Sequence, residues 1–211
     1  MHTTRFCIVR HGETDWNRER RLQGHLDIPL NRQGEEQALR LATALQLRGQ
    51  RFDSLHVSSL TRTRQTAAPL VDKLKLIAQF HDALKERHYG AFQGKTYDEA
   101  RTAMPEAWRK HQDRDPHYDM DGGETLQGFH QRIISHINWL AEAHPAQTVL
   151  VVAHGGVLEM IYRHATGTPL QKPRDFPIPN AALNWLSVGP QGWVLEKWAD
   201  ESHLAETLDE L

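Results

Sequence analysis

The sequence contains one cysteine, no long apolar run and almost no net charge. A lone thiol, Cys7, excludes an intramolecular disulfide and any zinc site built on several cysteines. The longest aliphatic run, residues 149–153, is far shorter than the roughly 20 residues that cross a bilayer. Because the first residues also lack the apolar core of a signal peptide, we expect a cytoplasmic protein that does not bind membranes.

The charges nearly balance, with 25 basic and 27 acidic residues and a net charge of −2. This balance excludes a strongly basic nucleic-acid binder and an acidic disordered chain. With 211 residues, 39% of them hydrophobic, the chain is long enough to bury a core without disulfides or metals. We therefore predict a single domain over residues 1–200, followed by a polar, acidic tail over residues 201–211.

Histidine, in contrast, is abundant, with 14 residues. Histidines serve as polar surface residues, as metal ligands or as catalytic groups. His130 and His136 are six residues apart, which places them on different faces of a predicted helix, and no His-Glu-x-x-His motif is present. A histidine-rich metal-binding protein is therefore the weaker alternative, and we ask which histidines take part in chemistry.

The apolar pattern predicts strands that alternate with helices. Residues 148–153 form the clearest strand, and apolar residues recur at helical spacing over residues 126–140. This alternation predicts a single-domain, three-layer α/β sandwich with a mostly parallel central sheet and helices on both faces. Residues 86–123 are rich in Gly, Pro, His, Asp and Trp, and we expect them to form an insertion, or lid, over the sheet. Further strands are expected at residues 6–9, 54–58, 76–80, 183–188 and 193–198. Further helices are expected between Asn31 and Gly49 and at residues 61–74, 97–104, 105–112 and 157–165. Pro69 is expected to bend or shorten the helix at residues 61–74.

Two predicted strands end in the same signature. Arg10-His11-Gly12 follows the first strand, and His154-Gly155-Gly156 follows the clearest one. The carboxyl ends of parallel strands meet at one edge of a sheet, where ligands bind, and a glycine after each histidine lets a ligand approach the backbone. Arg62 begins the helix after the second strand and is expected at the same edge. Two arginines and two histidines at a helix N-terminus form a cationic pocket whose natural ligand is a phosphate group.

Five segments together carry a resemblance to a known family. They are Arg10-His11-Gly12-Glu13-Thr14, Arg62 within residues 60–67, Glu86, Gly123-Glu124 and His154-Gly155. In this order, over residues 5–185, they resemble the histidine phosphatase superfamily, the phosphoglycerate mutase-like group that contains small cytosolic phosphatases and cofactor-dependent mutases. The resemblance implies a phosphoglycerate mutase-like fold, a phosphohistidine formed on His11, and phosphoryl oxygens held by Arg10, Arg62 and His154.

The resemblance also implies that Glu86 is the general acid, with Asp82 and Glu99 as rival carboxylates. Elementary chemistry agrees with these roles. A neutral imidazole nitrogen can attack phosphorus in line with the leaving oxygen, while the flanking cations stabilise the equatorial oxygens and make a metal unnecessary. Partial burial would raise the pKa of Glu86, so that it could protonate the leaving alkoxide and then activate water.

Substrate contacts are likewise implied by the resemblance. Two roles stay open for Glu124: it takes part in the site, or it is an early acidic residue that caps the long helix. The implied substrate-binding residues are Asn17, Gln23, Gly24, Tyr89, Arg109 and Gly155, of which Tyr89 and Arg109 would bind a carboxylate or phosphate group.

The family contains both hydrolases and mutases. Residues 86–90 and 108–110 resemble the mutases, but the mutases have a lysine at Tyr97, an asparagine at Gly156 and a longer insertion, and residues 23–30 resemble the phosphatases. A short lid admits water to the phosphohistidine, which favours hydrolysis. We therefore expect a phosphomonoesterase that acts on small phosphorylated metabolites and needs no cofactor.

Two alternative functions stay open. The first is an isomerase, a 2,3-bisphosphoglycerate-dependent phosphoglycerate mutase primed by that compound. The second is an inactive phosphate-binding regulatory module, which would have no use for a proton donor. The sequence indicates neither a nucleic-acid nor a membrane partner, and its six tryptophans leave a homodimer open.

Overall fold

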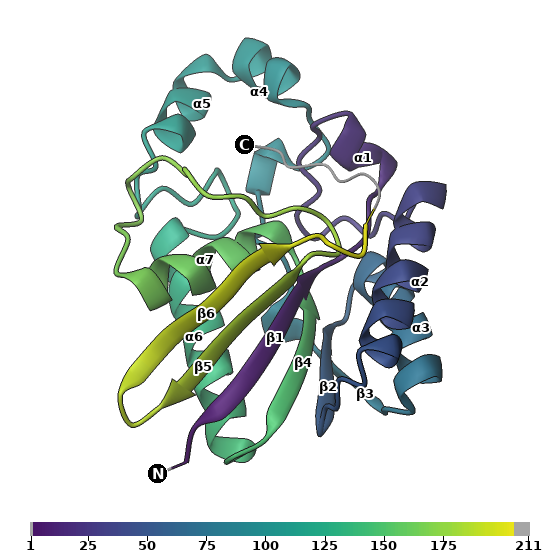
Figure 1. Ribbon diagram of the computed structural model, residues 1–211. Coiled ribbons are helices and arrows are strands. Elements are labelled where there is room, and N and C mark those ends of the chain that lie inside the picture. Colours follow the sequence, from purple (N-terminus) through teal and green to yellow (C-terminus); the bar gives the residue numbers. More distant parts are fainter. Residues whose placement is uncertain (1, 205–211) are drawn as a thin grey trace.

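The computed structural model describes residues 2–204, which form a central six-stranded sheet with the strand order β3-β2-β4-β1-β5-β6 (Figure 1). The first four of these strands are parallel, whereas β5 runs antiparallel to β1, and β6 antiparallel to β5. The predicted α/β sandwich with a mostly parallel sheet is confirmed. The strands are β1 (Thr4–Arg10), β2 (Ser54–Ser58), β3 (Ala78–His81), β4 (Thr148–Ala153), β5 (Leu183–Gly189) and β6 (Gly192–Asp200).

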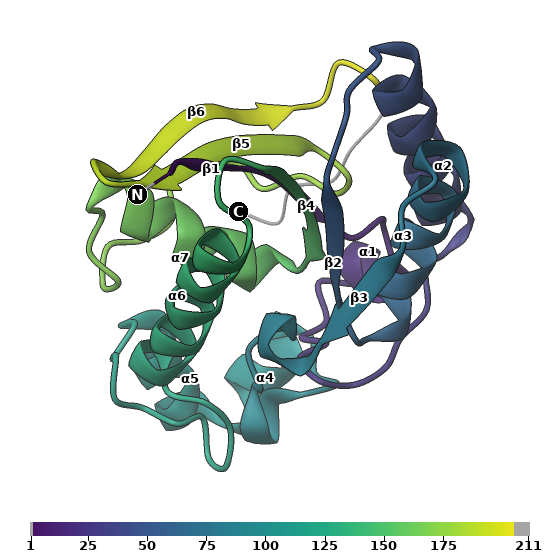
Figure 2. The same cartoon turned by 90° about the horizontal axis from the view of Figure 1, so that it is seen from below.

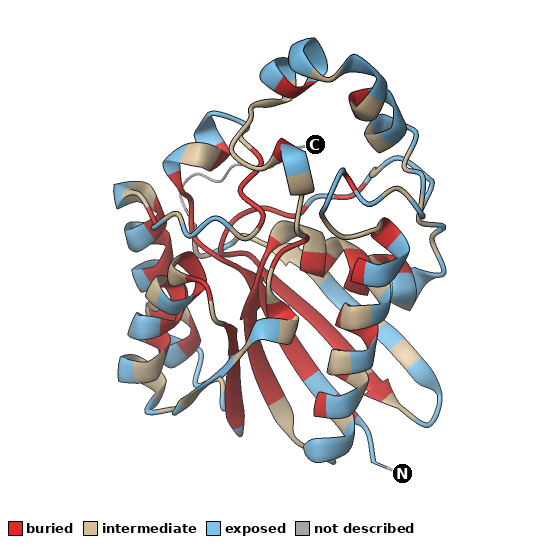
Figure 3. Cartoon of the chain, turned by 180° about the vertical axis from the view of Figure 1, so that it is seen from behind, coloured by how far each residue is buried: buried red, intermediate tan, exposed pale blue. Residues whose placement is uncertain are grey.

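Helices cover both faces of the sheet. Figure 2 shows α2 (Arg32–Leu47) and α3 (Thr61–Leu74) on one side, and α6 (Leu126–Ala143) and α7 (Gly155–Thr166) on the other. Because side chains alternate along a strand, β1 supplies both cores: Phe6 and Ile8 pack with α6 and α7, and Cys7 and Val9 pack with α2 and α3. Each buried aliphatic side chain stabilises the fold by about 1.5–3 kcal/mol. Figure 3 shows this burial along the inner strands, and β1, β2, β4 and β5 are the strands whose residues are mostly buried.

The start of α2 follows the local sequence, whereas the length of α3 does not. Asn31 caps α2 as predicted, accepting a hydrogen bond from the Gly34 amide. Pro69 does not shorten α3, which runs without interruption to Leu74. Ala67 and Leu70 are buried on either side of this proline, and their packing outweighs the single backbone hydrogen bond that proline removes.

The segment between β3 and α6 lies over the carboxyl edge of the sheet, at the top of Figure 1. Its helical parts are η1 (Asp82–Leu84), η2 (Gly90–Phe92), α4 (Tyr97–Ala103) and α5 (Pro105–Gln112). Phe92, Trp108 and Met120 form a small apolar core of its own, together with Leu22. Leu22 belongs to the loop after α1 (Asp15–Arg18), a helix too short for its periodicity to be visible in the sequence.

Four histidines cluster where β2, β3 and α6 meet, away from the predicted phosphate pocket. His56 of β2 is 1% exposed; its Nδ1 lies 2.9 Å from Nε2 of His81, and its Nε2 lies 3.0 Å from Nε2 of His144. His136 packs against His81, with ring centroids 4.8 Å apart. Within residues 2–204 no three His, Cys, Asp or Glu side chains are placed to hold a metal ion, and no helix there is long and apolar enough to cross a membrane.

Candidate active site

A pocket of about 240 Å³ lies between the carboxyl edge of the sheet and the segment of residues 86–123. The predicted strand-end residues meet there. Arg10 is opposite Ala153 in the parallel pairing of β1 with β4, so His11 and His154 leave the sheet side by side, with ring centroids 5.3 Å apart. Arg62, on the first turn of α3, lines the same pocket.

His11 is held as a neutral imidazole with a defined tautomer. Its Nδ1 lies 2.7 Å from the carbonyl oxygen of Gly12. Because a carbonyl only accepts, the neutral ring carries its proton on Nδ1 and keeps a lone pair on Nε2. Burial, and then the charges of Arg62 and Arg10, lower the pKa of His11 well below its usual value. His11 is a buried residue that lines the pocket, and its unprotonated Nε2 is the form that a nucleophile requires.

Two buried guanidinium groups flank this ring. Nη1 and Nη2 of Arg62 donate to the carbonyl oxygens of Leu26 and Gly24 at 2.9 and 2.8 Å, and Nη1 of Arg10 donates to the carbonyl oxygen of Ile178 at 2.8 Å. Burial lowers the pKa of Arg62 to about 10, so the group stays cationic at neutral pH. Backbone carbonyls thus fix two cations beside a neutral imidazole, which suits a tetrahedral anion such as phosphate.

His154 is fully buried behind the pocket wall. Its Nδ1 accepts a 3.2 Å hydrogen bond from Nε of Arg62, and its Nε2 lies 2.7 Å from the hydroxyl of Ser58. A guanidinium only donates, so the neutral ring carries its proton on Nε2. Burial and the charge of Arg62 lower the pKa of His154 well below its usual value. His154 therefore touches both His11 and Arg62, and those two residues, rather than His154, line the pocket.

Glu86 is the buried carboxyl group of the pocket. Its Oε1 accepts from the Arg87 amide at 2.8 Å, and its Oε2 accepts from the Gly156 amide at 2.9 Å. Burial is the largest influence on Glu86 and raises its pKa, as a proton donor near neutral pH requires. The rival carboxylates Asp82 and Glu99 are largely exposed, paired with cations, and do not line the pocket.

Two glycines in the strand-end motifs serve close packing. A Cβ on Gly156 would lie 2.2 Å from Oε1 of Glu86, so only glycine leaves the carboxyl group where it is. A Cβ on Gly12 would lie 2.4 Å from the backbone oxygen of Gly34. The prediction that Gly12 opens the backbone to a ligand is therefore wrong, because its missing side chain makes room for α2. Gly155, in contrast, lines the pocket as predicted.

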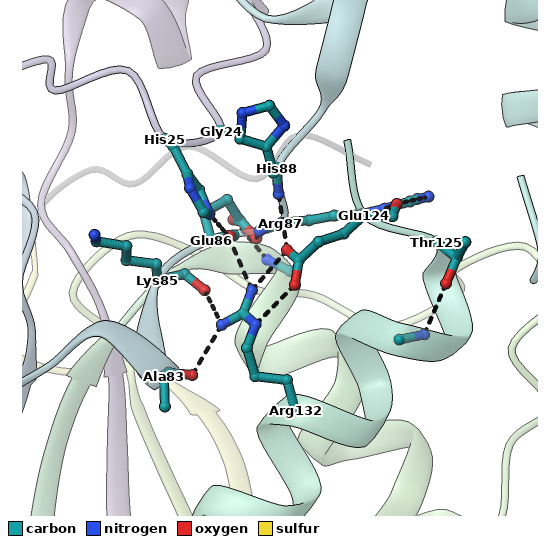
Figure 4. A network of polar contacts seen from close by, with 12 residues as sticks. Gly24, His25, Ala83, Lys85, Glu86, Arg87, His88, Glu124, Thr125 and Arg132 are labelled. Atoms are coloured by element: carbon teal, nitrogen blue, oxygen red, sulfur yellow. Dashed lines mark hydrogen bonds and ion pairs between the residues drawn. The ribbon is translucent and has the colours of Figure 1, made fainter. Parts of the chain in front are cut away.

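An ion pair supports the segment that carries Glu86. Nε and Nη2 of Arg132, on α6, donate to the two oxygens of Glu124 at 2.8 and 2.7 Å. Glu124 in turn accepts from the His88 amide at 2.9 Å. Figure 4 shows Arg132 reaching from its helix to both Glu124 and the backbone before Arg87. Glu124 is thus a positioning residue, and Arg132 also donates to the carbonyl oxygens of Ala83, Lys85 and Glu86.

Most of the predicted substrate contacts are present at the pocket. Arg109 is the exception, since it is exposed on α5 and does not line the pocket. Gln23 is 7% exposed, and its Oε1 is buried with no hydrogen-bond partner in the described part of the chain, which suits a ligand contact. The predicted residues that do line the pocket are Asn17, Gln23, Gly24, Tyr89 and Gly155.

The far end of the pocket is formed by residues that we did not predict. His111, Arg114 and Arg174 approach from the lid and from the loop after α7, and Glu159 projects from α7 itself. One signal was available for Glu159, because it follows Gly155 by four residues and so shares its helical face. No comparable signal existed for Arg114, whose position depends on how the lid folds.

Comparisons with known proteins agree with this geometry. Residues 6–201 match the family model described as the histidine phosphatase superfamily (branch 1). The chain is 34% identical over 203 residues to phosphoglycerate mutase-like protein 4 of Arabidopsis thaliana (95% of this chain, 86% of the relative). It is 32% identical over 205 residues to the metal-independent phosphoserine phosphatase of the same plant (96% and 84%).

Solved structures give the same result. YhfR of Bacillus stearothermophilus superimposes with a TM-score of 0.84 at 30% identity, covering 95% of this chain and 98% of that chain. The mycobacterial glucosyl-3-phosphoglycerate phosphatase superimposes with a TM-score of 0.79 at 27% identity, covering 94% of this chain and 99% of that one. These similarities extend over the sheet, the helices and the lid.

Proposed function

The chain belongs to the histidine phosphatase superfamily, branch 1, and we propose that it is a phosphomonoesterase of small phosphorylated metabolites that works through a phosphohistidine on His11. The observation that carries the proposal is the state of His11: a buried, neutral ring whose Nδ1 faces the Gly12 carbonyl, leaving Nε2 as the nucleophilic atom. Relatives named as phosphatases, including the metal-independent phosphoserine phosphatase, support hydrolysis of such esters.

In the first step, Nε2 of His11 forms a bond to phosphorus as the ester oxygen–phosphorus bond breaks. Glu86 gives its proton to the departing oxygen, so the alcohol leaves neutral. Arg10 and Arg62 stabilise the charge on the equatorial oxygens. His154 keeps Arg62 in register through the 3.2 Å contact between Nδ1 and Nε.

In the second step, the Glu86 carboxylate takes a proton from a water molecule. The water oxygen bonds to phosphorus, the nitrogen–phosphorus bond breaks, and inorganic phosphate leaves with Glu86 protonated again. The guanidinium groups of Arg10 and Arg62 take the part that a divalent cation takes in other phosphoryl transfers. We therefore expect turnover to continue in the presence of a chelator.

The test is His11→Ala, assayed by phosphate release from p-nitrophenyl phosphate. Turnover should fall to the background rate, and rapid acid-free quenching of the wild-type reaction should trap an alkali-stable, acid-labile phosphoryl group on the protein. Retained turnover in the variant would remove His11 as the nucleophile.

Phosphoglycerate mutase is the second candidate. The 34% identity to a phosphoglycerate mutase-like protein and the mutase-like residues 86–90 favour it. Incubation with 3-phosphoglycerate and a trace of 2,3-bisphosphoglycerate separates the two functions. A phosphatase releases inorganic phosphate, whereas pure isomerisation to 2-phosphoglycerate would contradict the proposal.

A further inference from the structure

The far end of the pocket contains a carboxylate oxygen that accepts no hydrogen bond from residues 2–204. Glu159 lies four residues after Gly155 on α7, so it stands one helical turn, about 6 Å, beyond the end of the pocket that holds His11 and Glu86. Oε1 of Glu159 accepts both hydrogen bonds that the side chain receives from residues 2–204, from Nη2 of Arg114 at 2.5 Å and from Nε of Arg163 at 2.8 Å. Oε2 accepts none and is not enclosed by protein.

Glu159 is fixed in this orientation by Arg163. The Arg163 side chain is fully buried, and its other two nitrogens donate to the carbonyl oxygens of Pro169 and Lys172 at 2.6 and 2.8 Å. Arg163 is thus occupied by protein groups, and it prevents Glu159 from turning away from the pocket. An acceptor that is held in place before the ligand arrives binds a donor at low entropic cost.

Arg114 completes the arrangement. Nε donates to the carbonyl oxygen of Leu170 at 2.6 Å and Nη2 to Glu159, while Nη1 makes no hydrogen bond to any described residue. The backbone of Arg114 has a left-handed φ of 52°, the conformation that ends helix α5 and turns the side chain of Arg114 toward α7. An anionic acceptor and a cationic donor therefore stand side by side at the pocket end.

We propose that this pair selects a phosphate ester whose alcohol part carries an ammonium group beside a carboxylate, as in an O-phosphorylated α-amino acid. The ammonium binds Oε2 of Glu159, and the carboxylate binds Nη1 of Arg114. The inference rests on the proposed phosphatase function, since the pair is placed to bind the leaving group.

Four phosphate esters separate the two contacts. O-phosphoserine carries both groups, phosphoethanolamine only the ammonium, the phosphate ester of 3-hydroxypropanoate only the carboxylate, and ethyl phosphate neither. The wild-type kcat/KM should be highest for O-phosphoserine. Glu159→Gln should reduce the ratio of O-phosphoserine to the 3-hydroxypropanoate ester by about ten- to a hundredfold, the range for a hydrogen bond to a charged group. The exposed residue Glu106 provides a matched control, Glu106→Gln, that should leave the ratio unchanged.

Arg114→Gln provides an independent arm, because it leaves the contact of Glu159 with Arg163 in place. It should reduce the ratio of O-phosphoserine to phosphoethanolamine by a similar factor and preserve the preference for an ammonium group, with Arg101→Gln as its exposed control. This arm stays informative if Glu159→Gln does not fold. Equal kcat/KM values for O-phosphoserine and the 3-hydroxypropanoate ester in the wild type would overturn the inference alone. Lack of turnover on every ester, p-nitrophenyl phosphate included, would overturn the phosphatase function with it.

Discussion

Lowering the pH from 8 to 5 should destabilise the protein through histidines that the fold keeps neutral. His56 is the clearest case. It is 1% exposed, and burial, followed by the charges of His81 and His144, lowers its pKa to about 3. An unfolded chain titrates near 6.5, so between these values the unfolded state binds more protons and the free energy of unfolding falls as the pH falls. The contribution of His56 is complete above about pH 6.5 and is lost progressively toward pH 3.

The size follows from the same two pKa values. At pH 5 an unfolded histidine is about 1.5 pH units below its pKa, which is worth about 2 kcal/mol of lost stability. His11 and His154 are as deeply buried, at 3% and 0% exposure, with pKa values also held well below normal. They add to the loss in the same direction, and the loss of about 2 kcal/mol from His56 alone is already a substantial part of the roughly 5–15 kcal/mol that stabilises a typical domain.

Urea unfolding followed by tryptophan fluorescence at pH 8 and pH 5 measures the effect. His56→Leu should remove about 2 kcal/mol of the difference between the two pH values, because it deletes one titrating group from both states. His117→Gln, at an exposed position, should leave the difference unchanged. A wild-type protein as stable at pH 5 as at pH 8, or a His56→Leu variant with the wild-type difference, would refute the reasoning.

Three further predictions concern the proton donor and its support. Glu86→Gln should reduce kcat by about 10²–10⁴-fold on alkyl phosphates and much less on p-nitrophenyl phosphate, whose leaving group needs no proton; equal losses on both would exclude Glu86 as the acid. Gly156→Ala should displace Glu86, since the added Cβ would lie 2.2 Å from its Oε1, and should lower kcat about tenfold and shift the pH–rate profile while circular dichroism is unchanged. An unshifted profile would show that the contact does not set the acidity of Glu86. Arg132→Met should lower the free energy of unfolding by about 2 kcal/mol, because Glu124 and three carbonyl oxygens lose their donor; an unchanged melting temperature would contradict this.

The phosphate end of the pocket was predictable because sheet geometry is regular. His11 and His154 both follow parallel strands, and such ends always meet at one edge. Arg62 was predictable for the same reason, as it occupies the first turn after the neighbouring strand. None of these positions depends on the lid.

The far end of the pocket was not predictable from spacing. The expectation for Arg109 rested on its place in a local motif, but α5 turns that residue to solvent and ends at Gln112. Arg114 lies beyond the helix, and its left-handed backbone directs the side chain to Leu170 and Glu159, more than forty residues away in sequence. Contacts between a folded lid and a distant helix leave no periodic trace in a single sequence.

The two ends of the lid meet at one point. The His88 amide donates to the Glu124 carboxylate, and the Glu124 amide donates to the His88 carbonyl oxygen at 2.9 Å. The chain between them therefore forms a closed loop. The entropic contribution to the free energy of closing a loop increases by only about 0.6 kcal/mol for each doubling of the loop's length. Insertions and deletions between these anchors leave Glu86 and its supporting arginine in place. A chimaera joined at His88 and Glu124 should therefore keep the chemistry of this protein and the contacts of Glu159 on α7, and should change only the substrate contacts that the lid supplies, such as that of Arg114.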